Sequence, residues 1–347
     1  ACITPSGRWL CAFRGARDKR SNAGQRTLLT WSDDAGRTWC DPFSPVAAPQ
    51  FGGLPGTLRC GGVLSLGEDR LLATLAWVDD SHPDLPYFNE KTEGLLDTRI
   101  VHALSEDRGA TWSAPWVMDT APFAPPTPTT GPSLRLPSGE IMCQFELNKP
   151  YIDPVPWRHA SVLMFSPDEG KTWPRYAVSA QDPEHRVFYW DQRPSLLPDG
   201  RLFVVFWTFD RASSQYLNIH ARESRDGGRT WSALWDTGVP GQPGPVFALV
   251  DGSLAMPVMD RTTTPRLVLR GSTDGGVTWD TEELLVHQAE QTTRKAADAS
   301  MQEAWNEMYA FALGLPHTAP LPGGGALLVY YAGKTTDETG IHWARIE

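Results

Sequence analysis

Hydrophobic and polar positions alternate along most of the chain in short runs that end in Gly, Pro, Asp or Ser. Residues 193–224 are typical and read RPSLLPDG, RLFVVFWTFD and, after a short loop, YLNIHARES. Alternation with a period of two, bounded by turn residues, indicates short β-strands. A helical period of 3.6 residues does not compete over most of the chain. The pattern therefore predicts an all-β fold.

The same order of strands recurs ahead of an eight-residue motif, S-x-D-x-G-x-T-W. Its five copies are SDDAGRTW (32–39), SEDRGATW (105–112), SPDEGKTW (166–173), SRDGGRTW (224–231) and STDGGVTW (272–279). A repeat of about 50 residues that carries four strands is typical of a β-propeller blade. The C-terminal stretch 323–347 adds strands without a motif and predicts a further blade.

We therefore predict one all-β domain over residues 1–347, a six-bladed β-propeller of four-stranded antiparallel blades. The expected blades are approximately residues 1–48, 49–118, 119–178, 179–236, 237–286 and 287–347. The last blade ends on GIHWARIE (340–347), which we expect to be an exposed sheet edge or to pair with another copy of the chain.

The repeated motif has a composition that folding alone explains. Asp and Ser side chains can bond to the backbone of a turn, and Gly supplies a positive φ. Trp can close the turn by burying a large apolar surface. We therefore expect the motifs to hold the blades, with mostly buried Trp side chains, and we expect the chemistry to lie elsewhere.

Composition narrows the possible partners. The net charge of −10 argues against binding to nucleic acid or to an anionic membrane surface. No apolar run has the 18 or more residues of a membrane-spanning helix. The five cysteines lack C-x-x-C spacing and the histidines lack metal-like spacing, so neither a metal nor another cofactor is predicted. The compartment stays open, either cytoplasmic or secreted after trimming, since the sequence begins with Ala1.

Long polar loops are expected on the propeller face opposite the motifs. They are residues 14–25, 79–94, 146–159, 181–193 and 259–266. Aromatic rings such as Trp190 can stack on sugar faces, and charged groups such as Glu146 can bind hydroxyl groups. This mixture favours a glycan as the ligand.

The motifs and the order of strands resemble the sialidase superfamily of six-bladed propellers, over essentially the whole chain. The resemblance implies an arginine triad that holds the substrate carboxylate, an Asp acid/base, and a Tyr nucleophile assisted by Glu. A tyrosine avoids the repulsion that a carboxylate nucleophile would meet from an acidic substrate.

In the first two blades the pattern is incomplete. The run TPSGRWLCAFRGAR begins at Thr4, just after the place of the first triad arginine, and Arg17 matches a family arginine after it. The acid/base position falls on Asn22, and an amide cannot donate a proton as a carboxylic acid does. Asp18 or Asp80 could take this role.

Later blades match better. Asp191 stands where the family has its Glu, and Tyr309 is nearest to the nucleophile, followed by Ala310 where Ser is usual. The second triad position falls near Trp207, with Arg211 just beyond it. The third plausibly matches Arg266, and Arg193 or Arg266 would hold a substrate carboxylate.

Three functions remain open. The first is a sialidase-like exo-acting glycoside hydrolase that releases a terminal acidic sugar from a glycan, with Tyr309 and Asp191 at its centre. The second is a non-catalytic propeller that binds glycan or protein, which the Asn22 substitution favours. The third is a polysaccharide lyase or another glycosidase on the same fold.

Overall fold

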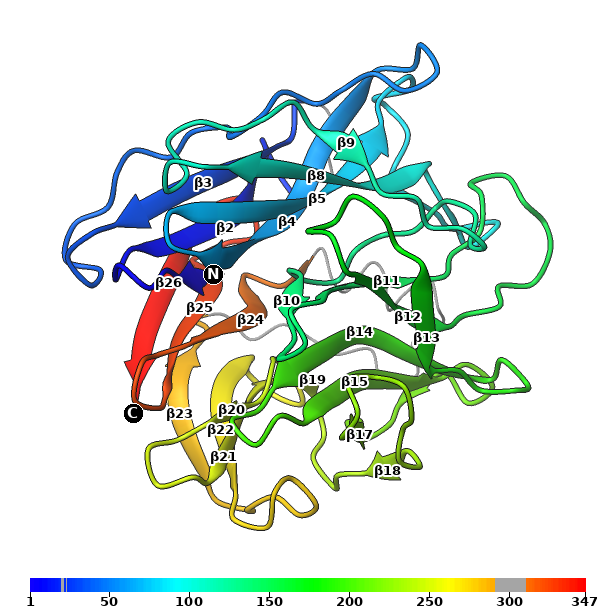
Figure 1. Ribbon diagram of the computed structural model, residues 1–347. Helices are drawn as coiled ribbons and strands as arrows, with labels where there is room; N and C mark the ends of the chain where they lie inside the picture. Colours follow the sequence, from blue (N-terminus) through cyan, green and yellow to red (C-terminus); the bar gives the residue numbers. More distant parts are fainter. Residues whose placement is uncertain (20–21, 23, 291–309) are drawn as a thin grey trace. The chain divides into compact units, whose positions relative to one another are not determined.

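The computed structural model describes residues 1–19, 22, 24–290 and 310–347 (Figure 1). They divide into two compact units. The first unit comprises residues 1–158 and 162–178, and the second comprises residues 159–161 and 179–347.

The strands of the first three blades form the sheets β1-β2-β3, β4-β5-β8-β9 and β10-β11-β12-β13, together with the small hairpin β6-β7. Their bounds are β1 Cys2–Ile3, β2 Trp9–Gly15, β3 Arg26–Ser32, β4 Gly56–Gly67, β5 Arg70–Asp79, β6 Phe88–Asn89, β7 Gly94–Leu95, β8 Thr98–Ser105, β9 Trp116–Val117, β10 Leu134–Arg135, β11 Ile141–Glu146, β12 Ser161–Ser166 and β13 Arg175–Ala180.

The strands of the other three blades form the sheets β14-β15-β17-β18, β19-β21-β22-β23 and β24-β25-β26, and β16 and β20 pair with β15 and β21. Their bounds are β14 Val187–Leu196, β15 Leu202–Asp210, β16 Gln215–Tyr216, β17 His220–Ser224, β18 Trp235–Asp236, β19 Gln242–Pro243, β20 Phe247–Ala248, β21 Leu254–Asp260, β22 Arg266–Ser272, β23 Glu283–Gln288, β24 Leu313–Pro320, β25 Ala326–Gly333 and β26 Thr339–Ile346.

Six antiparallel blade sheets follow one another along the chain, so the fold is an all-β six-bladed β-propeller, as the sequence predicts. The second and third blades have the expected four strands, and the fourth and fifth have a four-stranded path with one extra short strand. Within the described residues the first and sixth sheets have three strands. Short chain segments that pair at single positions, such as Leu29 with Phe43, accompany the first of them.

Alternating apolar side chains of successive blades build the core. In the first unit, Leu72 and Ile100 of the second blade pack with Phe145 of the third. In the second unit, Phe203 of the fourth blade packs with Met256 of the fifth. Burial of these surfaces stabilises each pair of neighbouring sheets.

The repeated motif forms a closed turn. In its first copy the Ser32 hydroxyl donates to the Asp34 carboxylate (2.7 Å), which also accepts hydrogen bonds from the backbone N–H (2.8 Å) and the hydroxyl (2.7 Å) of Thr38. The serine and threonine bonds recur in all five copies. These bonds to threonine lower the pKa of Asp34 to about 2. Trp173 is buried and the other four motif tryptophans are half-buried, so their expected burial holds fully for one copy.

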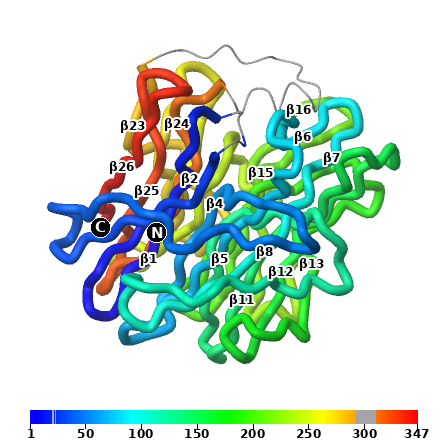
Figure 2. Tube along the Cα trace, turned by 90° about the horizontal axis from the view of Figure 1, so that it is seen from above, coloured from blue at the N-terminus to red at the C-terminus, as the bar shows by residue number. Residues whose placement is uncertain are grey.

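The strand β26 pairs with β25 and ends its sheet in the described part of the chain (Figure 2). Its side chains are largely exposed, including Ile341 at 40% and Trp343 at 39%. The open edge is therefore seen within the sixth blade, and pairing with another copy stays a prediction.

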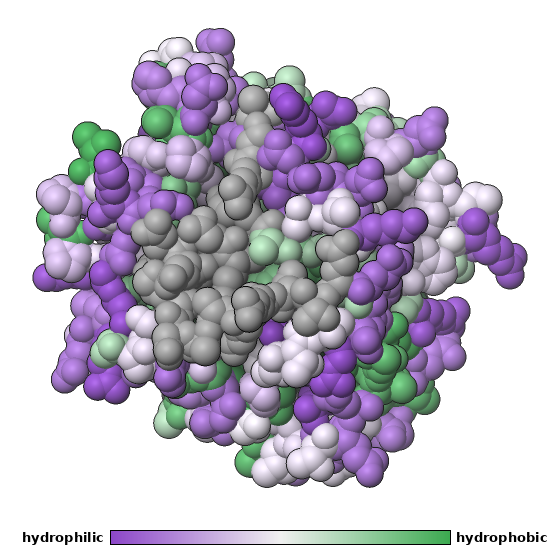
Figure 3. All heavy atoms as spheres, turned by 180° about the vertical axis from the view of Figure 1, so that it is seen from behind, coloured by the Kyte–Doolittle hydropathy of each residue, from purple (hydrophilic) through white to green (hydrophobic). Residues whose placement is uncertain are grey.

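The surface shown in Figure 3 is dominated by hydrophilic side chains, with apolar ones in separate patches. The described residues include no helix that is long and apolar enough to cross a membrane. They also contain no group of three or more His, Cys, Asp and Glu residues placed to hold a metal ion. All five cysteines are free thiols.

Candidate functional site

The candidate site in the second unit centres on Asp191, in the first strand of the fourth blade. The pairing of β14 with β15 shifts register between Trp190 and Arg193, and Asp191 in this bulge has a φ of +48°. A left-handed backbone is uncommon for a residue other than glycine, and such positions cluster at functional sites. The bulge therefore re-aims the Asp191 carboxylate away from the regular ladder.

Two side chains hold this carboxylate. The Gln242 amide nitrogen, at the start of β19, donates a hydrogen bond to Asp191 Oδ2. The guanidinium of Arg193, whose side chain is 6% exposed, forms an ion pair with the same oxygen at 3.4 Å. Gln242 thus orients the Asp191 carboxylate, and Arg193 compensates its negative charge.

Arg261, in the loop after β21, fixes the orientation of Gln242. Its Nη1 donates to Gln242 Oε1 at 2.6 Å, which directs the amide nitrogen of Gln242 towards Asp191. The guanidinium also lies 4.0 Å from the ring centroid of Phe311, a favourable cation–π distance. The result is a polar chain that runs from Arg261 through Gln242 to Asp191.

Tyr331 of β25 lies beside this chain. Burial raises the pKa of the Tyr331 phenol, while the charge and hydrogen bond of Arg261 oppose the rise. A Cβ atom at Gly314 would come within 2.8 Å of Tyr331 Oη and 2.9 Å of Arg261 Nη2. Gly314 therefore leaves the space in which the phenol and the guanidinium meet.

An aromatic wall adjoins the polar chain. The rings of Trp207 and Tyr216 stack at 4.7 Å with an interplanar angle of 3°. They line a cavity of about 90 Å³ together with Gln242, Arg261 and Phe311. Flat rings beside amide and guanidinium groups match the apolar C–H faces and the hydroxyl groups of a sugar, although a cavity of this size would enclose only part of one.

Other residues predicted from the sequence lie in the same unit with different surroundings. Trp190 is buried and stacks on Phe209 at 5.0 Å. Arg211 lies 5.8 Å from the ring of Phe188. Arg266 forms ion pairs with Asp260 and Glu283, each at 2.5 Å, so carboxylates of its own blade already compensate its charge.

The predicted nucleophile, Tyr309, lies outside the described residues. The sequence reasoning named Asp191, Arg193 and Trp190, which the structure places in one bulged strand. It missed Gln242, Arg261 and Tyr331. The loop 259–266 signalled Arg261 only as part of a polar rim, and no local pattern marked Gln242 or Tyr331.

In the first unit the predicted residues are spread over several loops. Arg17 is exposed, Asp18 is half-buried, and Glu146 is buried at the end of β11. Asp80 follows β5, and burial raises the pKa of its carboxyl group, assisted by the charge of Asp79. One carboxylate oxygen of Asp80 is buried without a hydrogen-bond partner among the described residues, and such burial disfavours the charged form of the group.

Asn22 is buried and hydrogen-bonded through both ends of its amide. Its amide nitrogen donates to the Leu85 carbonyl (3.1 Å), and its oxygen accepts from Arg59 (3.1 Å) and Gln25 (3.4 Å). These contacts suit an amide at this position, because an ionised carboxylate only accepts hydrogen bonds and could not donate to the Leu85 carbonyl.

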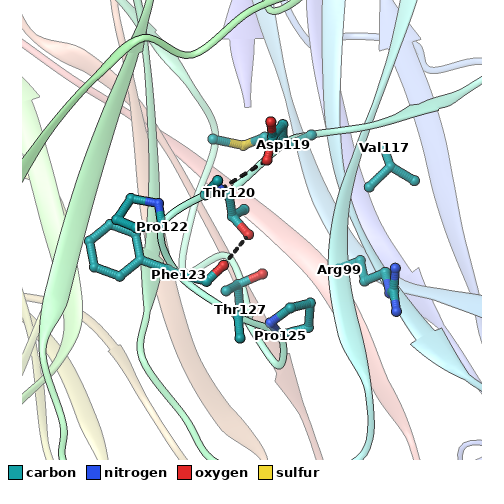
Figure 4. A pocket seen from close by; sticks show the side chains of 11 residues that line it. Arg99, Val117, Asp119, Thr120, Pro122, Phe123, Pro125 and Thr127 are labelled. Carbon is teal, nitrogen blue, oxygen red and sulfur yellow. Dashed lines mark hydrogen bonds between the residues drawn. The ribbon is translucent and has the colours of Figure 1, made fainter.

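A separate cavity of about 430 Å³ lies in the first unit (Figure 4). It is lined by residues 117–125 with Arg99 and Thr127. Its wall is shaped by hydrogen bonds within that segment, such as Thr120 Oγ1 to the Phe123 carbonyl at 2.9 Å. None of the site residues predicted from the sequence lines it.

A family model described as the BNR repeat-like domain matches residues 85–292 of the chain. The chain belongs to this family. This membership confirms the resemblance to the sialidase superfamily that the repeated motifs indicate. No curated protein matches the sequence of this BNR repeat-like chain.

Solved structures share its fold at low identity. A protein of unknown function from Dyadobacter fermentans has a TM-score of 0.74 at 20% identity, over 100% of this chain and 93% of that one. The Hadza microbial sialidase Hz136 has a TM-score of 0.67 at 17% identity, over 99% of this chain and 64% of that one. The intramolecular trans-sialidase from Ruminococcus gnavus, solved with oseltamivir carboxylate, has a TM-score of 0.63 at 14% identity, over 100% and 93%. The TM-scores establish a shared fold at these low identities.

Proposed function

We propose that the chain is a glycoside hydrolase of the sialidase type, which releases a terminal acidic sugar from a glycan. The observation that carries the proposal is the Asp191 carboxylate, held in a strained bulge by Gln242 and Arg193. An oriented carboxylate is suited to accept a proton from a nucleophile as that nucleophile attacks. Two of the proteins that share the fold are a sialidase and a trans-sialidase, which supports the substrate class.

In this proposal Tyr309 is the nucleophile and Asp191 draws its proton. The unperturbed pKa of tyrosine is about 10, so a phenol needs such a base near neutral pH. Asp80 is retained as a candidate proton donor, because burial raises the pKa of its carboxyl group. The wall of Trp207 and Tyr216 would contact the apolar face of a sugar.

The test is an assay of aryl glycosides, including sialosides and uronides, with the wild type and three variants. Asp191→Asn and Tyr309→Phe should each lower kcat/KM by about 10²- to 10⁴-fold on any substrate that the wild type cleaves. Asp251→Asn is the matched control, because Asp251 is exposed in a turn of the fifth blade. Full activity in both site variants would refute the assignment.

A binding propeller is the second candidate, and the bonded amide of Asn22 at the acid position of the resemblance favours it. A wild type that cleaves no substrate in the panel but binds acidic oligosaccharides would establish this function instead.

A further inference from the structure

The fourth position of the repeated motif, directly after the aspartate, has a left-handed backbone in all five copies. Its residues, with φ between 58° and 80°, are Ala35, Arg108, Glu169, Gly227 and Gly275. Glycine adopts this conformation freely, but it is uncommon for the residues that three of the copies carry there. The bonds that close the turn join the serine, aspartate, glycine and threonine positions. The fourth position is therefore left to make contacts outside its own turn.

Two arginines bond to backbone carbonyls at this position in the next blade. Arg8 stands just before β2 of the first blade, and its Nη1 donates to the carbonyl of Arg108 in the second blade at 2.9 Å. Arg201 stands just before β15 of the fourth blade, and its Nη1 donates to the carbonyl of Gly275 in the fifth blade at 3.1 Å. In both blades the arginine follows the turn between the first two strands. The same place in two blades thus contacts the same motif position in the blade that follows.

A third contact of this kind is an ion pair. Arg70 begins β5, the second strand of the second blade, and donates through Nη1 and Nη2 to the Glu169 carboxylate of the third blade at 2.7 and 2.6 Å. Two parallel bonds are the strong geometry between a guanidinium and a carboxylate. The hydrogen bond to Arg70 lowers the pKa of Glu169, because it stabilises the ionised form. The two side chains are 34% and 35% exposed, so solvent screens part of the interaction.

A carboxylate of its own blade holds each of these arginines. Arg8, Arg70 and Arg201 donate through Nε to Asp33 (2.7 Å), Glu106 (3.1 Å) and Asp199 (2.6 Å), respectively. In each case an Nη atom then makes the contact with the next blade. A guanidinium that is already fixed on its own blade loses little further side-chain freedom when it makes this second contact.

The third blade carries a different residue at the place of the arginines. Glu140 stands just before β11, the second strand of that blade, and an ionised carboxylate cannot donate a hydrogen bond to a carbonyl. Its carboxylate pairs instead with Arg175 of β13, in the same blade, at 3.2 Å. The contact between blades thus depends on the residue at this place and not on the motif alone.

We infer that the fourth position of the motif is a docking point through which an arginine of the preceding blade latches two neighbouring blades together. The motif then has two roles, because it closes its own turn and receives a side chain of its neighbour. In the second unit, the bond from Arg201 to the Gly275 carbonyl joins the same two blades as the bond from Gln242 to Asp191. These blades are thus tied at the motif turn as well as at the candidate site. The inference does not depend on hydrolysis.

A double-mutant cycle on Arg70 and Glu169 tests the latch. Thermal unfolding would be measured for the wild type, Arg70→Met, Glu169→Gln and the double variant, each also at high salt. Native-state hydrogen exchange would follow residues 66–79 of the second blade and 166–173 of the third. Glu140→Gln is the matched control, because it weakens a partly exposed ion pair that lies within one blade.

Each single variant should lower the melting temperature by about 2–4 °C. The double variant should lose no more than the larger single loss, because both substitutions remove one interaction. In Glu169→Gln, exchange should become about 5-fold faster in both segments, whereas Glu140→Gln should affect the third blade alone. At about 1 M NaCl the difference between the wild type and Glu169→Gln should shrink, since salt screens the pair.

Additive losses in the double variant would overturn the latch, because the two side chains would then act independently. Faster exchange in only one of the two blades in Glu169→Gln would also overturn it, as would an equal effect of Glu140→Gln on the second blade. A difference between the wild type and Glu169→Gln that salt leaves unchanged would contradict the ion pair. If Arg70→Met does not fold, exchange and salt dependence in Glu169→Gln still decide.

Discussion

His102 should make the folded chain sensitive to mild acid. It lies in β8 and is 0% exposed, with its ring stacked on Trp173 at 5.3 Å and tilted against Trp116 at 5.8 Å. Its Nδ1 is 3.4 Å from Thr74 Oγ1, and its Nε2 has no partner among the described residues. Burial between aromatic rings lowers the pKa of His102 from 6.5 to about 4.

The direction and size of the effect follow from this pKa. In the unfolded chain His102 gains a proton as the pH falls through 6.5, whereas in the folded chain it resists protonation down to about pH 4. The unfolded state therefore binds more protons across this window, and stability is lost as the pH falls. At about 1.4 kcal/mol for each pKa unit, the loss amounts to about 3 kcal/mol.

The assay is urea denaturation at pH 7, 6, 5 and 4, followed by tryptophan fluorescence. His102→Phe keeps a ring against Trp173 but cannot titrate, so its free energy of unfolding should fall by about 3 kcal/mol less than that of the wild type between pH 7 and pH 4. The motif aspartates, such as Asp34 and Asp274 with a pKa of about 2 in the folded chain, also begin to reduce stability near pH 4, but the wild type and His102→Phe share them and the effect cancels in the comparison. His82→Gln is the control, because His82 is exposed. Equal pH dependence in the wild type and His102→Phe would refute this reasoning.

Two further predictions address the motif and the site. Trp173→Ala should lower the free energy of unfolding by about 3–5 kcal/mol, because Trp173 is only 7% exposed. Trp39→Ala should lower it by less, because Trp39 is half-buried. Equal losses of the two variants in chemical denaturation would contradict the structural role given to the motif. Gln242→Leu removes both the donor to Asp191 and the acceptor of Arg261. It should lower kcat/KM about 10- to 100-fold on any aryl glycoside that the wild type cleaves, and an unchanged value would show that the polar chain does not position Asp191.

Local sequence patterns predicted the blades because each blade is built from interactions between residues close in sequence. The five motifs close their turns through bonds between positions two and four residues apart, so their spacing alone revealed them. The number of residues between Asp191 and the Pro-Asp-Gly turn of the fourth blade also identified Asp191 as a candidate. The alternation of apolar and polar residues along a strand cannot reveal a bulge. One extra residue in a strand changes the direction in which a side chain points without changing the composition of the strand.

The partners of the site residues depend on contacts between distant segments. Gln242 is 51 residues from Asp191, and Tyr331 reaches Arg261 from a different blade. The sequence left Asp18 and Asp80 as equal candidates, and it could not show that burial raises the pKa of the Asp80 carboxyl group. Likewise Arg59 reads in the sequence as one arginine among many, and only tertiary packing shows that amides and a tyrosine ring surround it. Charge compensation and solvation are set by neighbours in space, and for this chain those neighbours come from other strands and loops.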